Sequence, residues 1–203
     1  MELLDTKRKV EIKCRNIVIK PITIDLITPK YLSWLNDSEI NQYLEIRNTI
    51  STYESVINYI NQTRNKLGCE FFAILINDNE HIGNFNLTCF NHYIGYAQYG
   101  LMIGDKRAQN LGIGGLVSIM IAEYLFSLDE IRKIEHFIIS ANERSWRTAE
   151  TVGYLREGAL RQHDKLMNGD FTDTYSYGMF KAEWLINRIK FSAILKDFQI
   201  SQF

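Results

Sequence analysis

The stretch Gln109-Asn110-Leu111-Gly112-Ile113-Gly114-Gly115 lies between a predicted strand and a long apolar segment with the pattern of a helix. Glycines let the backbone approach a ligand closely, and free amides at a helix N-terminus point towards a bound anion. The positive end of the helix dipole strengthens that attraction. The stretch therefore predicts a phosphate-binding turn with a pyrophosphate as its natural ligand. The alternative is a glycine-rich turn that binds nothing.

Two common phosphate-binding motifs do not fit this turn. A Walker loop requires a Lys followed by Ser or Thr after the glycines, and neither is present. A Rossmann turn requires a strand that opens a βαβ unit and an acidic residue at the end of the next strand. Here the preceding strand belongs to a predicted antiparallel meander, and Asp129 and Glu130 come before the next strand.

Hydrophobic periodicity predicts strands and helices in a mixed order on both sides of the turn. Thr28-Pro29 has the pattern of a helix start, and Ser51 has capping-box spacing to Glu54 at the start of a second helix. The strands are predicted at 11–22, 69–76, 81–90, 94–103, 131–140, 154–166 and 171–180. The helices are predicted to end at 36–37 and near 68, to follow the glycine turn, and to cover 142–152 and 181–199.

Composition limits the classes of partner and compartment. The chain has 203 residues, 46% of them hydrophobic, and a formal net charge of -1, which argues against binding to nucleic acid. Met1 to Val10 is charged and resembles no signal peptide, and no apolar run reaches the length of a membrane span. We therefore expect a cytoplasmic protein without a membrane partner. The odd number of cysteines and the lack of a ligand-like pattern predict no metal site and three reduced, buried thiols: Cys14, Cys69 and Cys89.

The glycine turn and several downstream motifs resemble the GCN5-related N-acetyltransferase (GNAT) superfamily. Gln109 to Gly114 matches the family's pyrophosphate signature, Arg/Gln-x-x-Gly-x-Gly/Ala. Further matches resemble its RimJ/RimL-like branch: Asn142-Glu143-Arg144-Ser145, Val152-Gly153-Tyr154, Glu157-Gly158, Asn168-Gly169, Asp173, Tyr177 and Glu183-Trp184. The resemblance spans about Cys14 to Trp184. It implies an α/β (α+β) fold in which a mixed, mostly antiparallel central sheet is flanked by helices on both faces. We expect a single domain over 1–203, with a tail at 1–10 and a helical extension at 185–203.

The same resemblance implies acetyl-CoA as the donor and no metal. Strand residues 101–103 would pair with the pantetheine arm in the manner of an added strand, and the amides of 111–115 would hold the pyrophosphate. Candidates for the outer phosphate are Lys106, Arg107, Arg144 and Arg147. The cofactor-binding residues implied by the resemblance are Leu101, Met102, Ile103, Gln109, Asn110, Leu111, Gly112, Ile113, Gly114, Gly115, Asn142, Ser145 and Arg147.

The implied chemistry is direct attack of an amine on the thioester. An ammonium must first lose a proton to a base, and the leaving thiolate must gain one. By similarity to the branch, Ser145 is the candidate acid, although a Ser at this place also suits a helix cap or the first helical turn. The candidate bases are Asp164, His163 and Glu45. A surface location is the alternative for His163, and a solvated or salt-bridged helix end is the alternative for Glu45.

The acceptor is left open by the sequence, and we expect residues 36–65 and 160–173 to determine it. One candidate is a protein N-terminal amine, and the other is a small amine such as an amino-sugar nucleotide. No acidic cluster that would favour a polyamine is visible in these segments. A non-catalytic CoA-binding sensor or scaffold on the same fold is the alternative to an enzyme. Apolar residues of the C-terminal segment fit either a homodimer contact or packing on the sheet: Phe191, Ile194, Leu195 and Phe198.

Overall fold

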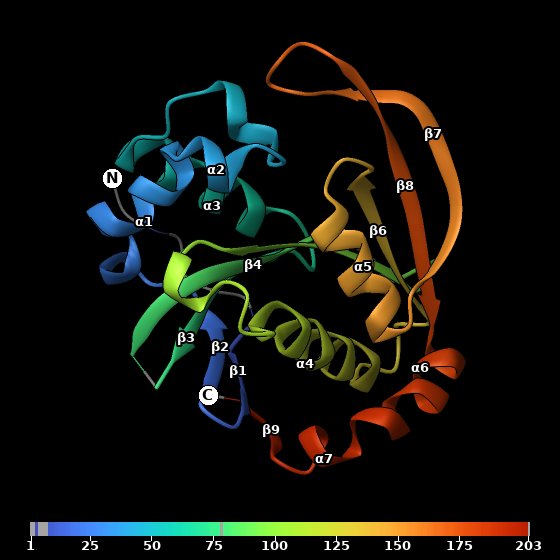
Figure 1. The fold of residues 1–203 in the computed structure, drawn as a ribbon. Coiled ribbons are helices and arrows are strands. Elements are labelled where there is room, and N and C mark those ends of the chain that lie inside the picture. The colour runs from blue at the N-terminus through green and yellow to red at the C-terminus, as the bar shows by residue number, and fades with distance from the viewer. Residues whose placement is uncertain (1–2, 4–7, 78, 203) are drawn as a thin grey trace.

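The computed structural model of the protein describes residues 3, 8–77 and 79–202, except for the side chain of Cys89. Nine strands form one sheet in the order β7-β8-β6-β5-β4-β3-β2-β1-β9 (Figure 1). Neighbouring strands run antiparallel, except that β5 and β6 run parallel. The predicted mixed, mostly antiparallel sheet is confirmed.

The structure gives the following element bounds. The strands are β1 (Val10–Cys14), β2 (Ile17–Pro21), β3 (Glu70–Ile76), β4 (Glu80–Asn91), β5 (Tyr96–Ile103), β6 (Lys133–Ile139), β7 (Leu155–Lys165), β8 (Phe171–Phe180) and β9 (Phe198–Gln202). The α-helices are α1 (Pro29–Asn36), α2 (Ser38–Asn41), α3 (Tyr53–Asn65), α4 (Ile113–Ser127), α5 (Glu143–Val152), α6 (Lys181–Asn187) and α7 (Ser192–Leu195). The 3-10 turns are η1 (Ile24–Leu26), η2 (Glu45–Asn48), η3 (Lys106–Ala108) and η4 (Arg188–Phe191).

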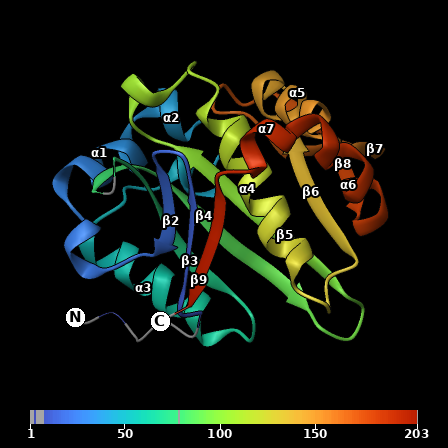
Figure 2. The ribbon, with the colours of Figure 1, turned by 90° about the horizontal axis from the view of Figure 1, so that it is seen from below.

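Helices cover both faces of the sheet, as predicted. Helices α1, α2 and α3 lie on one face, and α4 and α5 lie on the other (Figures 1 and 2). Two apolar cores result: a smaller one under α1 and α3, and a larger one under α4 and α5. Helix α4 is buried over most of its surface, and the Trp184 indole on α6 donates a hydrogen bond to Glu123 on α4 (2.8 Å). This packing fixes the start of α4, where the glycine turn lies.

The single strand predicted over 11–22 is wrong, because β1 and β2 form a hairpin there. The chain reverses at Arg15 and Asn16, and Arg15 adopts φ +54°, a conformation that glycine accepts most readily. A turn without glycine or proline leaves no clear sign in the sequence. The turn is supported from outside the hairpin, since the amide of Asn77 donates to the carbonyl of Asn16 (2.9 Å).

The helix cap predicted at Ser51 lies one residue later. The Thr52 hydroxyl accepts from the amide of Ser55 (3.1 Å), and the Ser55 hydroxyl accepts from the amide of Thr52 (2.8 Å). This is a capping box in which Ser55 replaces the usual Glu or Gln. Glu54 resembles the usual acidic member of a box, and for this reason the sequence pattern indicated Ser51.

The helix predicted over 181–199 is also wrong, because it breaks into α6, η4 and α7 and ends in strand β9. Strand β9 pairs antiparallel with β1 from Cys14↔Phe198 to Val10↔Gln202. It thereby supplies hydrogen-bond partners to an edge of the sheet that would otherwise be open. Phe191, Ile194, Leu195 and Phe198 pack against the larger core, so the expectation of packing on the sheet is confirmed. Most of the predicted tail at 1–10 lies outside the described residues.

Two of the three cysteines agree with their predicted burial. Cys14 and Cys69 are buried free thiols, and each lies within hydrogen-bond distance of a main-chain carbonyl, that of Ile194 and that of Thr88. The side chain of Cys89 lies outside the described part of the structure.

None of the helices in the described part of the chain is both long and apolar enough to cross a bilayer.

Candidate functional site

The site is built where β5 and β6 separate. The two strands pair only over Tyr96–Gln98 and Lys133–Glu135, although β5 continues to Ile103 and β6 to Ile139. Beyond this point β5 stays paired to β4 and β6 stays paired to β8. The edges of β5 and β6 that face one another therefore diverge and leave a cleft between them. Main-chain groups along such an edge can pair with an extended ligand.

The glycine turn lies at the mouth of this cleft. The Gln109 side chain donates to the carbonyl of Ile103 (2.8 Å) and so ties the turn to the end of β5. Asn110 and Gly112 have φ angles of +63° and +74°, and Gly112 caps α4. A Cβ atom added to Gly112 or Gly114 would meet no atom within 4 Å. The start of α4 is therefore an open cradle with unpaired amides, which suits a pyrophosphate.

A cavity of about 430 Å³ occupies the cleft. It brings together seven of the residues that the family resemblance implied for cofactor binding: Leu101, Met102, Ile103, Gln109, Gly114, Asn142 and Ser145. The other six do not line it. Among these, Ile113 is buried in the core, Leu111 is 70% exposed, and Arg147 forms an ion pair with Glu143 (2.6 Å). The cofactor role of Arg147 stays a prediction that its geometry does not favour.

The start of α5 forms one wall of the cleft. The Asn142 side chain caps this helix by accepting a hydrogen bond from the amide of Ser145 (3.2 Å). Asn142 therefore performs the capping function considered for Ser145, and Ser145 lies in the first turn of α5, which was the other part of that alternative. The Ser145 side chain is partly buried and lines the cleft. Its role as a proton donor stays a prediction.

Two of the four basic residues predicted for the outer phosphate are already neutralised. Lys106 forms ion pairs with Asp37 (2.9 Å) and Glu39 (2.6 Å). Arg107 forms ion pairs with Glu80 and with Asp105. Arg144 is exposed and lines the cleft, so it is the best placed of the four.

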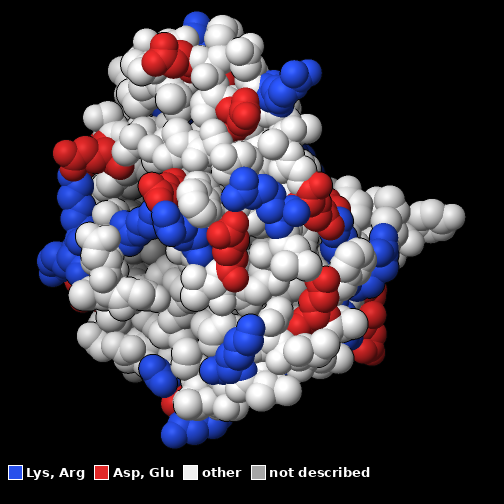
Figure 3. Space-filling model, turned by 45° about the vertical axis from the view of Figure 1, so that its right-hand side comes forward, with Lys and Arg blue, Asp and Glu red and all other residues white. Residues whose placement is uncertain are grey.

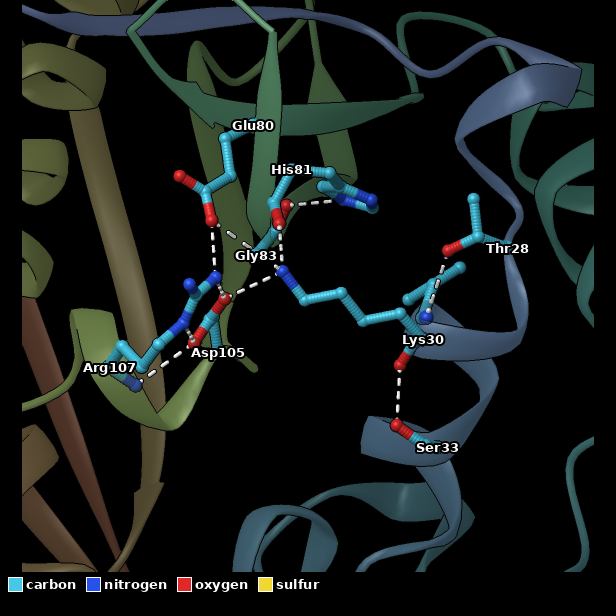
Figure 4. Close-up of polar contacts among 9 residues, drawn as sticks. Thr28, Lys30, Ser33, Glu80, His81, Gly83, Asp105 and Arg107 are labelled. Atoms are coloured by element: carbon cyan, nitrogen blue, oxygen red, sulfur yellow. Dashed lines mark hydrogen bonds and ion pairs between the residues drawn. The ribbon is translucent and has the colours of Figure 1, made fainter.

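Asp105 is the centre of the network that engages Arg107 (Figure 4). Its side chain accepts from Arg107 and from Lys30 of α1 (2.7 Å each), and these cations hold its pKa well below the usual range although burial opposes them. The network joins α1 to the segment that precedes the glycine turn.

On the face drawn in Figure 3, acidic and basic side chains are interspersed rather than gathered into a patch of one sign.

A second cavity, of about 680 Å³, lies on the other side of the strand gap. It is bordered by β3, β4, β5 and β6 on one side and by α1, η2 and α3 on the other. Eight residues line both cavities, so the two spaces meet where β5 and β6 separate: Tyr43, Leu44, Tyr99, Gly100, Leu101, Met102, His136 and Phe137. We refer to the second space as the acceptor cavity.

The predicted bases occupy different places. Glu45 lines the acceptor cavity. Asp164 forms an ion pair with Arg47, and Arg47 also donates to the carbonyls of Leu44 and Lys165 (2.9 Å each). Asp164 and its exposed neighbour His163 line neither of the two cavities. The assignments of Asp164 and His163 as bases stay predictions, but the structure does not bring them to the strand gap.

The sequence reasoning missed a polar cluster that lies at the strand gap. The ring of His136 packs edge-on against Tyr99 (4.1 Å between centroids) and at a similar angle against Tyr154 (4.7 Å), and the two hydroxyls are 3.4 Å apart. Burial lowers the pKa of His136 to about 4 and raises the pKa of Tyr99 to about 12, so all three groups are neutral at pH 7. Tyr154 belongs to the motif Val152-Gly153-Tyr154, but the motif did not indicate a place at the strand gap. Only strand alternation signals Tyr99 and His136 in the sequence, and alternation does not distinguish a site from a core.

Comparison with known proteins agrees with this geometry. Residues 16–155 match the family model of the acetyltransferase (GNAT) domain. The chain belongs to the GNAT family of acetyltransferases. It is an acyltransferase that depends on acetyl-CoA and acetylates nitrogen, so the predicted family and enzyme class are confirmed.

Individual relatives are distant in sequence and similar in fold. The uncharacterized N-acetyltransferase p20 of Bacillus licheniformis is 22% identical over 152 residues, which are 73% of this chain and 84% of that relative. A spermidine N-acetyltransferase from Vibrio cholerae, solved with CoA and spermine, is 17% identical with a TM-score of 0.73 over 84% of this chain and 98% of that one. RimL, a ribosomal L7/L12 α-N-protein acetyltransferase solved with CoA, is 16% identical with a TM-score of 0.75 over 84% and 97%. Both solved structures share the fold of this chain.

Proposed function

We propose that this GNAT enzyme binds acetyl-CoA in the cleft between β5 and β6 and a primary amine in the acceptor cavity, and that the amine attacks the thioester directly. The observation that supports this proposal is the meeting of the two cavities at the strand gap. Two ligands that enter from opposite sides can touch there without an acetylated enzyme residue between them. Acetyl-CoA supplies a thioester carbonyl at this point.

Residues of the cleft would position the donor along its length. The edge of β5 at 101–103 offers main-chain groups to the amide-containing arm. The cradle at Gly112 and Gly114 offers amides to the pyrophosphate, and Arg144 offers a cation near the start of α5. The relatives solved with CoA support acetyl-CoA as the ligand of this cleft.

For the acceptor we favour a small amine without phosphate groups. Glu45 and Glu135 contribute carboxylates to the acceptor cavity, and no Lys or Arg is among the described residues that line it. Asn84 adds a buried amide oxygen without a hydrogen-bond partner, which could accept from a ligand N–H. A diphosphate such as that of an amino-sugar nucleotide would face two carboxylates without a Lys or Arg in the lining. An ammonium would face the same two carboxylates, of which only Glu135 is paired to a cation, Lys133. The spermidine-acetylating relative has an acceptor of this cationic kind.

An assay of thiol release with a panel of amines tests the proposal. We expect turnover with acetyl-CoA and small amines such as glucosamine or spermidine, and at least tenfold lower kcat/KM for glucosamine 6-phosphate than for glucosamine. Peptides with free N-termini form the third arm of the panel. Turnover confined to peptides would replace the small amine by a protein N-terminus. Binding of acetyl-CoA without turnover of any amine would favour the sensor alternative.

Ser145→Ala tests the proton donor for the leaving thiolate. We expect kcat to fall by about 10–100-fold, because general acid catalysis typically contributes at least that much, with Kd for acetyl-CoA changed less than threefold. Thr151→Val is the matched control, since Thr151 is exposed on the same helix and its hydroxyl only donates to the carbonyl of Arg147 (2.8 Å). An unchanged kcat in Ser145→Ala would remove Ser145 from the mechanism. The Tyr99 and Tyr154 hydroxyls would then be the next candidates for the proton donor.

A further inference from the structure

Glu135 is the carboxylate of the acceptor cavity that lies closest to the strand gap in the fold. It pairs with Gln98 in the last rung of the parallel ladder between β5 and β6. The next residue of each strand, Tyr99 and His136, lines both cavities. A group held by Glu135 therefore lies beside the place where donor and acceptor meet.

The carboxylate of Glu135 is held on both oxygens. Oε1 forms an ion pair with Lys133 (3.0 Å), and Oε2 accepts from the Gln98 side-chain amide (3.3 Å). Its side chain is 25% exposed, so it is neither sealed in the core nor free in solvent. Two anchored oxygens give the group a defined orientation, which a base or an ammonium-binding site needs.

Lys133 does not cancel the charge of Glu135, because it is shared. Its Nζ atom also forms an ion pair with Glu157 (2.8 Å). Burial opposes the charge on this ammonium, but its bonds to Glu157 and Glu135 prevail and raise the pKa of Lys133. Two carboxylates around one ammonium leave a net negative charge. Of the two, only Glu135 lines the acceptor cavity, so the excess charge is presented to the acceptor.

We propose that Glu135 binds the ammonium of the acceptor and removes its first proton, either directly or through one water. This inference rests on the proposed function. The neutral nitrogen then forms a bond to the acetyl carbon as the carbon–sulfur bond breaks. The first proton passes from Glu135 to solvent, and the second proton that the nitrogen loses passes to the departing sulfur, so the products are the acetamide, free CoA thiol and one proton.

The other carboxylates are less suitable for this role. Asp164 is engaged by Arg47 and does not line the acceptor cavity. Glu45 lines the cavity from η2 and is exposed. It does not belong to either of the strands, β5 and β6, that border the strand gap. Glu45 is therefore placed to attract a cation rather than to take a proton from a nitrogen beside the donor.

The test compares Glu135→Gln with Glu135→Asp and Glu157→Gln in the full chain, with the best amine found in the panel. Glu135→Gln should lower kcat/KM for the amine at pH 7 by about 100-fold or more, the usual scale for loss of a general base. Glu135→Asp keeps a carboxylate and should recover part of this loss. Glu157→Gln leaves Lys133 paired to Glu135 alone, so it should lower kcat/KM by less than tenfold, far less than Glu135→Gln. Kd for acetyl-CoA should be unchanged in all three.

Two further measurements distinguish a base from a structural residue. Between pH 6 and 9, kcat/KM of Glu135→Gln should rise about tenfold per pH unit, because only amine that is already neutral in solution can react. The wild type should be much flatter, since it binds the ammonium and deprotonates it. Calorimetry with CoA bound should show at least tenfold weaker binding of the amine to Glu135→Gln.

The outcomes separate this inference from the proposed function. If the wild type acetylates an amine but Glu135→Gln keeps its rate and pH profile, the role of Glu135 is wrong and the enzyme class stands. If Glu157→Gln loses as much activity as Glu135→Gln, the Lys133 network is structural and Glu135 is not the base. If the wild type binds acetyl-CoA but acetylates no amine, the proposed function fails and the role of Glu135 fails with it.

Discussion

Replacement of Gly114 by Glu should abolish the binding of acetyl-CoA in a protein that remains folded. Gly114 lies in the first turn of α4 and lines the donor cleft, and a Cβ atom there would meet no atom within 4 Å. It is not among the glycines with a positive φ, so a side chain causes no backbone strain. A glutamate at a helix N-terminus also favours the helix. Its carboxylate would occupy the anion cradle and repel the pyrophosphate, so we expect Kd to rise by at least 100-fold.

Calorimetric titration with CoA measures this effect, and thermal unfolding checks the fold. Gly114→Gln is the matched control, because glutamine has nearly the same volume as glutamate but no charge. The Gly114→Gln variant should bind CoA more tightly than Gly114→Glu does. The corresponding change at Gly112 would be harder to interpret, since that residue has φ +74° and a side chain there is strained. Unimpaired binding of CoA by Gly114→Glu would show that the pyrophosphate does not lie at the start of α4.

Replacement of Glu70 by Ala should lower the free energy of unfolding by about 3–5 kcal/mol, as for other buried ion pairs that lose one partner. The side chains of Arg64 on α3 and Glu70 on β3 are 3% and 0% exposed, and their charged groups are 2.6 Å apart. Glu70 also accepts from the amide of Phe71 (2.8 Å), and Arg64 donates to the carbonyl of Ile22 (2.7 Å). Without Glu70, the guanidinium of Arg64 remains buried beside an amide that has lost its acceptor.

Urea unfolding of Glu70→Ala measures this loss. The double variant Arg64→Met with Glu70→Leu is the control, because apolar replacement of both partners avoids the unpaired charge and should recover most of the stability. The Arg64–Glu70 pair joins α3 to the sheet, and α3 forms a wall of the acceptor cavity. Glu70→Ala should therefore weaken the binding of the amine more than the binding of acetyl-CoA. A loss below about 1 kcal/mol would mean that water reaches the pair.

The fold could be anticipated from the sequence because its signals are local. The glycine turn Gln109 to Gly115 marks a helix start, the alternation of apolar residues in β4 follows directly from strand geometry, and the continuous apolar run of β3 suits a strand buried on both faces. The predictions that failed depended on distant partners. The turn at Arg15 and Asn16 is supported by Asn77, and β9 forms because β1 offers an open edge almost the whole chain away.

The candidate site likewise has one part that local sequence motifs predicted and one part that depends on distant residues. The residues predicted to bind the donor at 109, 114, 142 and 145 belong to motifs with fixed spacing, and the structure brings them to one cleft with 101–103. The acceptor residues follow no motif. Asp164 matched the family pattern only loosely and is engaged by Arg47, while Glu135 carries no sequence signal and lies at the strand gap. Both carboxylates have a cationic partner, Arg47 for Asp164 and Lys133 for Glu135, but only Glu135 lines the acceptor cavity. Position in the fold therefore decides between them.

The sequence by itself determined that a chain of near-neutral net charge contains a glycine turn at a helix start. A backbone cradle needs only glycines and a helix start, both of which are encoded within a few consecutive residues. The tertiary structure alone decided which acidic partners the basic side chains pair with, which carboxylates line the acceptor cavity, and how the C-terminal segment adds a strand to the sheet. The physical reason is range: backbone conformation depends on neighbours in the chain, whereas electrostatic pairing and strand addition depend on neighbours in space.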